Sequence, residues 1–335
     1  MRFAFALVLL ALAAPAAAAP TEPIVVAVVD SGVDPSVPGL VAGRNVLAGS
    51  ADTHDDQGHG TGVARVVTEG CGGCRIMPVK IDANGSSTQG TIAAGIRWAA
   101  EHGARVINLS WGLALGAQST YEVERAITHA TARGALVTTG AMNDGTRNPR
   151  INPWASNSPD AVRVTAVDDQ GRLLRVSNHG IWVDVGAPGT ASSNAAPRVA
   201  AAAALVLAAH PQLDPLQLRA ALRRGCRPVA GLDVGWRCVL DADGAVKAAG
   251  ANVPTYRLFV GRGGKGGGIV TAAGAAIECG LFCTDRLDAG TTVRLVATPF
   301  RGNRFVRWQG ECRGPKRVCV VRIAGPTKTV AFFSP

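Results

Sequence analysis

The chain has 335 residues and carries 34 Lys and Arg against 24 Asp and Glu, a formal net charge of +10 at pH 7. This length suits one large domain and one small one. Beyond the N-terminus, the apolar run at 199–209 is only about half of the roughly 20 residues that a membrane-spanning helix needs, so the composition excludes such a helix.

The first residues have the pattern of a secretory signal peptide. Arg2 supplies a positive charge, an apolar run follows up to about Ala14, and the exit is rich in alanine. We therefore predict a signal peptide at residues 1–19, with cleavage at or close to Ala18. The mature protein is expected to be secreted, either extracellular or periplasmic, and monomeric.

Residues 24–224 alternate between apolar runs and helical patterns. Runs typical of strands buried on both faces occur at 24–30, 75–81, 105–110, 135–139 and 162–167. Helical patterns occur at 88–102, 121–133, 193–210 and 214–224. The alternation predicts an α/β domain at 20–250, with a mostly parallel sheet covered by helices on both faces. Sites in such sheets lie at the carboxyl ends of strands, where Asp30 and Ser110 are found.

Two adjacent serines, Ser192 and Ser193, precede a segment made almost entirely of alanine and valine. This segment predicts a helix that packs closely on all sides. Because proline is tolerated in the first turn of a helix, Pro197 is expected to mark its start and to place Ser193 at the N-terminus. The helix dipole there favours an oxygen that carries negative charge. The alternative is that Ser193 is simply an N-cap.

The character of the chain changes after residue 252. The glycine-rich stretch GRGGKGGG is followed by short β-prone runs without helical periodicity, which predicts a small all-β module at 255–335 after a linker near 249–254. This module has 13 Lys and Arg against 4 Asp and Glu, whereas residues 20–254 have 20 of each. The basic surface would suit an anionic cell-surface polymer, and a merely solvated surface is the alternative.

Eight cysteines in an exported chain predict disulfides. Their spacing suggests four local pairs, although the last four cysteines could also interlace: Cys71 with Cys74, Cys226 with Cys238, Cys279 with Cys283 and Cys312 with Cys319. The segment CGGC at 71–74 could also be a redox motif, but it leads into a strand-like run and lacks the helix that lowers a thiol pKa.

Three distant residues suit nucleophilic catalysis. A serine nucleophile needs an imidazole to take its proton, and the imidazole needs a carboxylate to hold its tautomer. The chain supplies Asp30 at a strand end, His59 in DDQGHGTGVARVV, and Ser193 at a helix start. The order Asp, His, Ser is that of the subtilisin arrangement, and no G-x-S-x-G elbow is present.

Other polar residues are weaker candidates for chemistry. Asp55 and Asp56 lie in a short polar loop, so we expect them at the surface, capping a turn. The remaining histidines have no zinc-ligand spacing, which predicts that no metal is bound through them: His54, His102, His129, His179 and His210.

Residues 24–248 resemble the subtilisin family of serine peptidases. Five segments resemble, in order, its aspartate motif, histidine motif, substrate strand, pre-nucleophile segment and nucleophile helix: VVDSGVD, GHGTGVA, INLSWG, SNHGIWVDVGAPG and SSNAAPRVAAAAAL. The resemblance implies a subtilisin-like fold with Asp30, His59 and Ser193 as the catalytic triad. Aligning SNAAP with the family's S-x-A-x-P makes Ser193 the nucleophile and Ser192 its neighbour.

The same resemblance implies roles for residues around the triad. Asn143 in AMNDG stands where the family keeps its oxyanion asparagine, and the alternative is an ordinary turn residue before Asp-Gly. Trp111 and Met142 could be core side chains, but the resemblance favours walls of the substrate pocket. The implied substrate-binding residues are Ser110, Trp111, Gly112 and Met142.

The tail at about 266–333 resembles cysteine-containing bacterial repeat modules that are attached to secreted enzymes. The segments GIVTAAGAAIECGLFC, TTVRLVATP, RFVRWQGEC and KTVAFF carry this resemblance. It implies a β-rich module used for adhesion or spacing, with Trp308 as a core aromatic residue.

Four features depart from the family pattern. Only a few residues separate the predicted signal peptide from the first strand, so we expect folding without a propeptide or with help in trans. Only four residues separate Pro188 from Ser193, which predicts an open rim. Met142 replaces a glycine and is expected to restrict the pocket to small side chains. Arg65 and Arg198 replace small residues or histidine, so each should reach solvent or a carboxylate.

The sequence thus predicts a secreted serine endopeptidase that cleaves peptide or protein substrates through an acyl-enzyme. The alternatives are a catalytically inactive binding scaffold with this fold, or a surface adhesin that acts through the basic module. No cofactor is expected to be required; calcium is common in the family, but the chain has no clear site for it.

Overall fold

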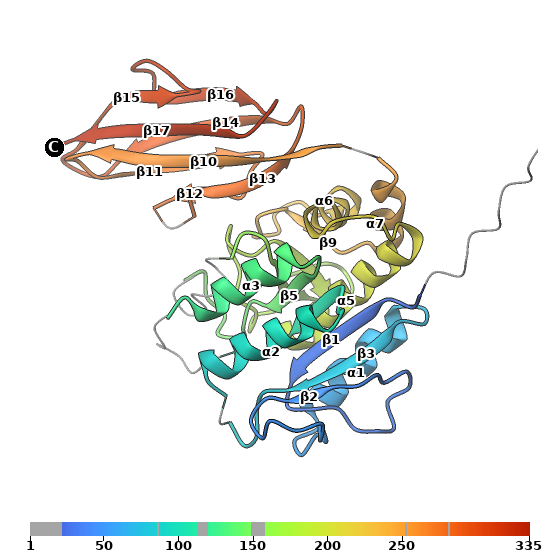
Figure 1. The fold of residues 1–335 in the computed structure, drawn as a ribbon. Helices are drawn as coiled ribbons and strands as arrows, with labels where there is room; N and C mark the ends of the chain where they lie inside the picture. Colours follow the sequence, from blue (N-terminus) through green and yellow to red (C-terminus); the bar gives the residue numbers. More distant parts are fainter. Residues whose placement is uncertain (1–21, 86, 113–119, 149–157, 252, 281) are drawn as a thin grey trace, which may run out of the picture.

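The computed structural model describes residues 22–85, 87–112, 120–148, 158–251, 253–280 and 282–335 (Figure 1). The predicted signal peptide lies outside these residues. An α/β domain contains the described residues up to Ala249, and a module of β-strands begins at Thr255.

The α/β domain is built on a nine-stranded sheet within the described residues, in the order β2-β3-β1-β4-β5-β6-β7-β9-β8. Neighbouring strands are parallel except for the β8–β9 pair, which is antiparallel. The strands are β1 (Val25–Asp30), β2 (Arg44–Asn45), β3 (Arg75–Lys80), β4 (Val106–Leu109), β5 (Leu136–Gly140), β6 (Val162–Val167), β7 (Val185–Pro188), β8 (Arg227–Pro228) and β9 (Cys238–Val239). The predicted mostly parallel sheet is confirmed.

Helices cover both faces of the sheet, as predicted. They are α1 (His59–Gly70), α2 (Gln89–Glu101), α3 (Glu122–Ala132), α5 (Ser192–Ala209), α6 (Pro215–Gly225) and α7 (Ala242–Ala249). Alternate residues of β1 face opposite layers: Val26 and Val28 join the core under α1, α5, α6 and α7, while Ala27 and Val29 join the core under α2 and α3. Because β1 is buried on both faces, its sequence up to Val29 is a continuous run of apolar residues.

Local capping explains where two of the helices begin. Thr88 caps α2 and Asp214 caps α6, each in a capping box with the third helical residue, and Pro215 occupies the first turn of α6. The sequence prediction missed α7 and the strands β2, β7, β8 and β9.

The C-terminal module packs two four-stranded sheets around its own core. One sheet has the order β13-β10-β17-β15 and the other the order β12-β11-β14-β16. The strands are β10 (Thr255–Gly264), β11 (Gly268–Ala273), β12 (Glu278–Cys279), β13 (Thr284–Asp288), β14 (Thr292–Pro299), β15 (Arg304–Gly310), β16 (Val318–Arg322) and β17 (Thr327–Ser334). The predicted β-rich character of this segment is confirmed.

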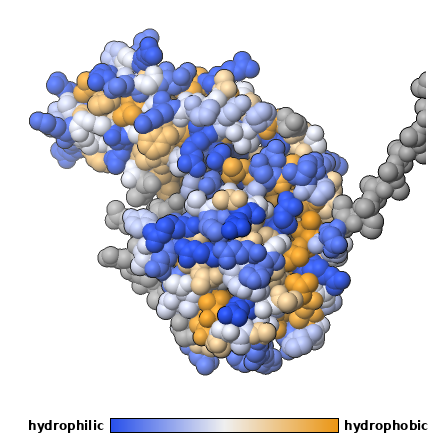
Figure 2. All heavy atoms as spheres, viewed as in Figure 1, coloured by the Kyte–Doolittle hydropathy of each residue, from blue (hydrophilic) through white to orange (hydrophobic). Residues whose placement is uncertain are grey.

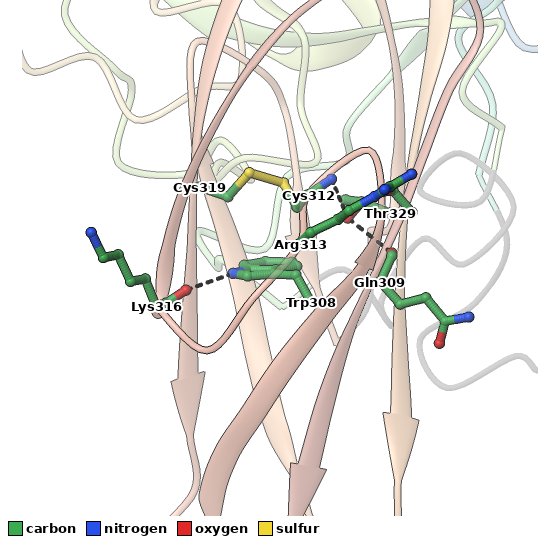
Figure 3. Close-up of a disulfide and its surroundings, with 8 residues drawn as sticks. Trp308, Gln309, Cys312, Arg313, Lys316, Cys319 and Thr329 are labelled. Atoms are coloured by element: carbon green, nitrogen blue, oxygen red, sulfur yellow. Dashed lines mark hydrogen bonds between the residues drawn. A yellow bond between two sulfur atoms is a disulfide. The ribbon is translucent and has the colours of Figure 1, made fainter.

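Trp308 belongs to the core of the module, as the sequence predicts. It is 2% exposed, and its indole Nε1 donates to the carbonyl oxygen of Lys316 at 2.9 Å (Figure 3). The Cys312–Cys319 disulfide lies beside it and links the loop that follows β15 to strand β16. A buried indole N–H needs such an acceptor. Because the ring is buried and its N–H is already bonded, Trp308 serves the core of the module and not a ligand-binding surface.

The structure contains disulfides between all four neighbouring cysteine pairs, Cys71–Cys74, Cys226–Cys238, Cys279–Cys283 and Cys312–Cys319. Within the residues that the structure describes, no helix is both long and apolar enough to cross a membrane.

Candidate active site

Asp30 and His59 meet at the carboxyl end of β1. Asp30 is the last residue of that strand and is fully buried, and His59 is the first residue of α1. The imidazole Nδ1 lies 2.7 Å from Asp30 Oδ1. Gly60 permits this approach, because a Cβ there would stand 2.1 Å from the carbonyl oxygen of Gly32. Gly58 is needed for a different reason, since its φ of 79° favours glycine.

The environment of His59 favours its protonated form. The hydrogen bond to the Asp30 carboxylate raises the pKa of the imidazole, and burial of the ring opposes this rise. The negative charges of Asp30 and Asp55 raise the pKa further. A carboxylate held against Nδ1 also fixes the tautomer, so that Nε2 is the nitrogen left to accept a proton.

Asp55 is not at the surface, and this prediction was wrong. The residue is 8% exposed, whereas the side chain of Asp56 is 56% exposed. The Asp55 carboxylate accepts hydrogen bonds from Ser31 Oγ, from Thr61 N and Oγ1, and from the backbone N–H groups of Gln57 and Gly58. Burial alone would raise the pKa of Asp55, but these donors, Thr61 first, lower it to about 2. The buried Asp55 carboxylate therefore accepts hydrogen bonds from backbone N–H groups near the start of α1 that have no partner within the helix.

The two adjacent serines have different environments. The helix α5 begins at Ser192 with Ala191 as its N-cap, so Ser193 is the second helical residue and the alternative that it caps the helix is wrong. Ser192 is 2% exposed and fills the space above Gly140, whereas Ser193 is partly exposed. Of these two serines, Ser193 is therefore the one that solvent or a substrate can reach.

Pro197 lies inside α5 instead of marking its start, which corrects the sequence prediction. In an α-helix the N–H of residue 197 would donate to the carbonyl of residue 193, and proline has no N–H. The Ser193 carbonyl accepts instead from Ser110 Oγ at 2.9 Å. Proline inside this helix thus frees the Ser193 carbonyl for a contact with the sheet.

The Ser110 hydroxyl belongs to a buried chain of hydrogen bonds across two strands. Thr138 Oγ1 donates to Asn108 Oδ1 at 3.1 Å, and Asn108 Nδ2 donates to Ser110 Oγ at 2.9 Å. Ser110 then donates to Ser193. Ser110, predicted as a substrate-binding residue, therefore also positions the helix that carries Ser193.

A pocket of about 230 Å³ brings most of the predicted residues together. It is lined by His59, Ser110, Trp111, Gly112, Gly140, Met142, Asn143, Ser192 and Ser193. The Trp111 ring packs edge-on against the His59 ring, with 5.5 Å between centroids, and its Nε1 donates to Ser87 Oγ. Asp30 lies behind His59 and does not line the pocket.

Met142 narrows the same pocket. Its thioether lies directly over Gly112, since a Cβ built on that glycine would stand 2.1 Å from the sulfur. The backbone of Met142 has a φ of 74°, a conformation that a long side chain rarely adopts. The side chain is therefore placed over the floor of the pocket at a conformational cost.

Asn143 lies at the rim of this pocket, in the loop of residues 141–146 that we call the oxyanion loop. Its Oδ1 accepts from the backbone N–H of Ser192 at 2.8 Å. Because the carboxamide oxygen is used in this way, the Nδ2 group remains as a donor. A donor beside a serine hydroxyl can stabilise an oxyanion.

The two arginines that depart from the family pattern, Arg65 and Arg198, are both exposed to solvent, as predicted. Other residues of the site were not anticipated. Ser31, Ser87, Asn108 and Asn178 make buried or partly buried contacts with partners far away in the sequence. Three of them, Ser31, Asn108 and Asn178, lie within the motifs quoted above, but the motifs alone do not reveal these partners.

Comparisons with known proteins agree with this geometry. A thermophilic serine proteinase of Bacillus sp. (strain AK1) is 33% identical over 236 residues, which cover 62% of this chain and 57% of the relative. Thermitase of Thermoactinomyces vulgaris is 30% identical over 241 residues, which cover 63% of this chain and 84% of thermitase. The crystal structure of a cold-adapted subtilisin-like serine proteinase matches with a TM-score of 0.56 at 27% identity, over 65% of this chain and 86% of that one.

The fold is thus that of the subtilisin-like serine proteinases. Residues 21–236 match the model of the subtilase family, and the chain belongs to that family. Residues 266–334 match the model of the divergent InlB B-repeat domain, in agreement with the predicted repeat module.

Proposed function

We propose that this protein is a secreted serine endopeptidase that cleaves peptide bonds through an acyl-enzyme. The observation that carries the proposal is the 2.7 Å contact between Asp30 and His59 at a pocket that Ser193 also lines. In this proposal the Ser193 hydroxyl attacks the substrate carbonyl, His59 accepts its proton and later gives it to the leaving amine, and Asp30 stabilises the imidazolium.

Asn143 is proposed to stabilise the tetrahedral intermediate. Its Nδ2 group would donate to the oxyanion that forms when Ser193 attacks. The partial positive charge at the N-terminus of α5, where Ser193 is the second residue, acts in the same direction. Peptide and protein substrates follow from this chemistry, and the position of Met142 favours small side chains before the scissile bond.

Labelling by a fluorophosphonate tests the proposal on purified mature protein. We expect Ser193 to be labelled in folded protein, and Ser193→Ala to abolish labelling and to lower turnover by about 10⁶-fold. Ser192→Ala is the matched control and should still be labelled. Folded wild-type protein that hydrolyses no peptide and does not react would favour the alternative of an inactive binding scaffold.

We further propose that catalysis needs no cofactor, because every group named in the mechanism is a side chain of this chain. Dialysis against EDTA should then leave the rate of hydrolysis unchanged. A loss of activity that calcium restores would contradict this part of the proposal. Export is proposed from the N-terminal pattern, and a monomeric state is assumed; fractionation of culture medium and light scattering test these two points.

A second proposal concerns the module and an anionic cell-surface polymer. Among the described residues, two cations of the module form ion pairs: Arg257 and Arg286 both pair with Asp160 of the α/β domain. Within the part of the chain that the structure describes, the other cations of the module make no ion pairs, and hydrophilic residues cover much of the face of the module seen in Figure 2. Unpaired positive charges at this density attract polyanions, and salt screens the attraction within about 10 Å at 0.1 M.

Charge reversal in the full chain tests this second proposal. Arg307→Glu, Arg313→Glu and Lys316→Glu together should abolish retention on dextran sulfate at low salt, without loss of peptide hydrolysis. The matched control reverses three exposed charges of the α/β domain, Arg65, Arg75 and Arg133. Equal retention of both triple variants would rule out the module as the binding surface.

A further inference from the structure

Asn178 is a fully buried residue of the segment that precedes β7, and it is hydrogen-bonded at every polar group. Its backbone N–H donates to the carbonyl of Met142, and its carbonyl accepts from Thr165 Oγ1 at 2.6 Å. Its side chain makes four further hydrogen bonds, all of them to the oxyanion loop: Nδ2 to Ala141 O and Asp144 Oδ2, and Oδ1 from Asp144 N and Thr146 N.

These bonds lie on both sides of Asn143. On its N-terminal side, the Ala141 carbonyl accepts from Asn178 Nδ2 at 2.9 Å. On its C-terminal side, the N–H groups of Asp144 and Thr146 donate to Asn178 Oδ1 at 2.9 and 3.1 Å. One carboxamide thus holds the loop before and after Asn143.

The loop needs such a support because its backbone is unfavourable by itself. Met142 has a φ of 74°, which is unfavourable for a residue with a long side chain, whereas the φ of 63° at Gly145 is one that glycine adopts readily. Asn143 is exposed, and among the described residues its side chain is anchored through one hydrogen bond, from Ser192 N–H to Oδ1. The position of its Nδ2 group therefore depends on the shape of the backbone around it.

We propose that Asn178 is a positioning residue for the oxyanion donor: its carboxamide fixes the loop that aims Asn143 Nδ2 at the developing oxyanion. This inference rests on the proposed peptidase function. Asn178 does not touch substrate, so its substitution should act through Asn143. A displacement of about 1 Å in a catalytic group can cost about 100-fold in rate.

A double-mutant cycle tests the proposal in the full chain. Asn178→Asp keeps the size of the side chain but loses both Nδ2 donors and sets a second carboxylate against Asp144. We expect kcat on a short peptide to fall by about 10- to 100-fold with little change in KM. In the Asn143→Ala background, itself lowered by about 10²- to 10³-fold, the same change should cost less than about threefold.

Two further variants keep the test decisive. Thr165→Val removes the hydrogen bond on the side of Asn178 that faces away from the loop, and it should leave kcat within about twofold. Should Asn178→Asp not fold, Asp144→Ala removes one partly buried contact between the loop and Asn178, and we expect a fall in kcat of about 3- to 10-fold that disappears when Asn143 is alanine.

The outcomes separate this inference from the proposed function. Equal fold-losses from Asn178→Asp with and without Asn143, or no loss at all, would overturn the positioning role. Absence of hydrolysis in the wild-type protein would instead overturn the peptidase proposal. Active-site titration with the fluorophosphonate corrects each kcat for the folded fraction.

Discussion

Ser192 and Ser193 have the same side chain, and their surroundings alone distinguish them. Ser192 is buried against Gly140, and its N–H holds Asn143, while Ser193 opens to the pocket that contains His59. The position of each on the first turn of α5 decides this difference, because successive helical residues point about 100° apart. A substitution at either serine should therefore have different consequences.

The first prediction at the residue scale concerns pH. The hydrogen bond to Asp30 raises the pKa of His59, and only the neutral imidazole can accept a proton from Ser193. We expect the acidic limb of kcat/KM to lie above pH 6.5, the ordinary value for histidine, so that activity rises with pH through neutrality. A pH–rate profile measures this, and a midpoint below about pH 6 would contradict it.

The sign is opposite for stability. A raised pKa in the folded state means that the protonated imidazole stabilises the fold; this contribution is fully present below the unfolded-state pKa and is lost as the pH rises through the folded-state pKa. His59 thus favours the folded state most in the pH range in which the proposed enzyme is least active.

The second residue-scale prediction concerns Met142. Met142→Gly removes the side chain over Gly112 and places glycine at a backbone position with a φ of 74°. We expect kcat/KM for peptides with Phe or Leu before the scissile bond to rise about 10- to 100-fold relative to Ala peptides. Met142→Ala serves as the control that opens the pocket without the glycine conformation. An unchanged ratio in both variants would show that Met142 does not set the preference.

At the scale of elements, α1 and α5 are each anchored by side chains that bond to backbone groups left without a partner inside the helix. The start of α1 is held by Asp55 and by Ser31 Oγ, which accepts from Gly60 N at 3.0 Å. In α5, the missing N–H of Pro197 leaves the Ser193 carbonyl to Ser110. These contacts fix the two helices that carry His59 and Ser193 against the sheet.

The prediction for α1 concerns Asp55→Asn. The pKa of Asp55 is lowered from 3.8 to about 2, so its ionised form contributes about 2 kcal/mol to folding above pH 4, and this contribution is lost as the pH falls toward 2. Asp55→Asn should lower the thermal midpoint at pH 7, with a smaller difference from wild type near pH 2. The exposed Asp169→Asn is the control. A pH-independent difference would contradict the role of the charge.

At the scale of the whole molecule, the module is docked onto the α/β domain. Asp288 of the module pairs with Arg223 and Arg224 of α6 at 3.2 and 3.0 Å. Phe282, between the two cysteines of the Cys279–Cys283 loop, belongs to a buried cluster of the α/β domain that includes Trp182 and Ala141, the first residue of the oxyanion loop. The module is therefore more than a tethered adhesive segment.

The corresponding prediction concerns cooperativity of unfolding. Because Phe282 is buried among residues of the other domain, we expect a single calorimetric transition for the wild-type protein. Phe282→Ala should cost about 3–5 kcal/mol and split or lower this transition, while Phe300→Ala, at a half-exposed position, should change stability by less than about 0.5 kcal/mol. Two separate transitions in the wild type would mean that the domains are not coupled.

Much of this protein follows from its sequence. Apolar runs, capping residues and the order of the motifs predicted the parallel sheet, the helices α2, α3, α5 and α6, the β-rich module and the candidate residues Asp30, His59 and Ser193. The strands, helices and caps depend on neighbours within a few positions, through backbone hydrogen bonding and the periodicity of burial, so they can be predicted without coordinates. The three candidate residues were found differently, from the order of their motifs and the resemblance of those motifs to a known family.

Only the tertiary structure decided which polar groups are buried and what they bind. Asp55 lies in a polar stretch of sequence, yet it is buried and accepts a hydrogen bond from Ser31, 24 positions away. Pro197 is tolerated inside α5 because Ser110, 83 positions from Ser193, donates to the Ser193 carbonyl that the proline leaves without a partner. Asn178 supports a loop more than 30 positions earlier. Burying a polar group is unfavourable unless a partner meets it, and that partner is supplied by the way distant strands come together.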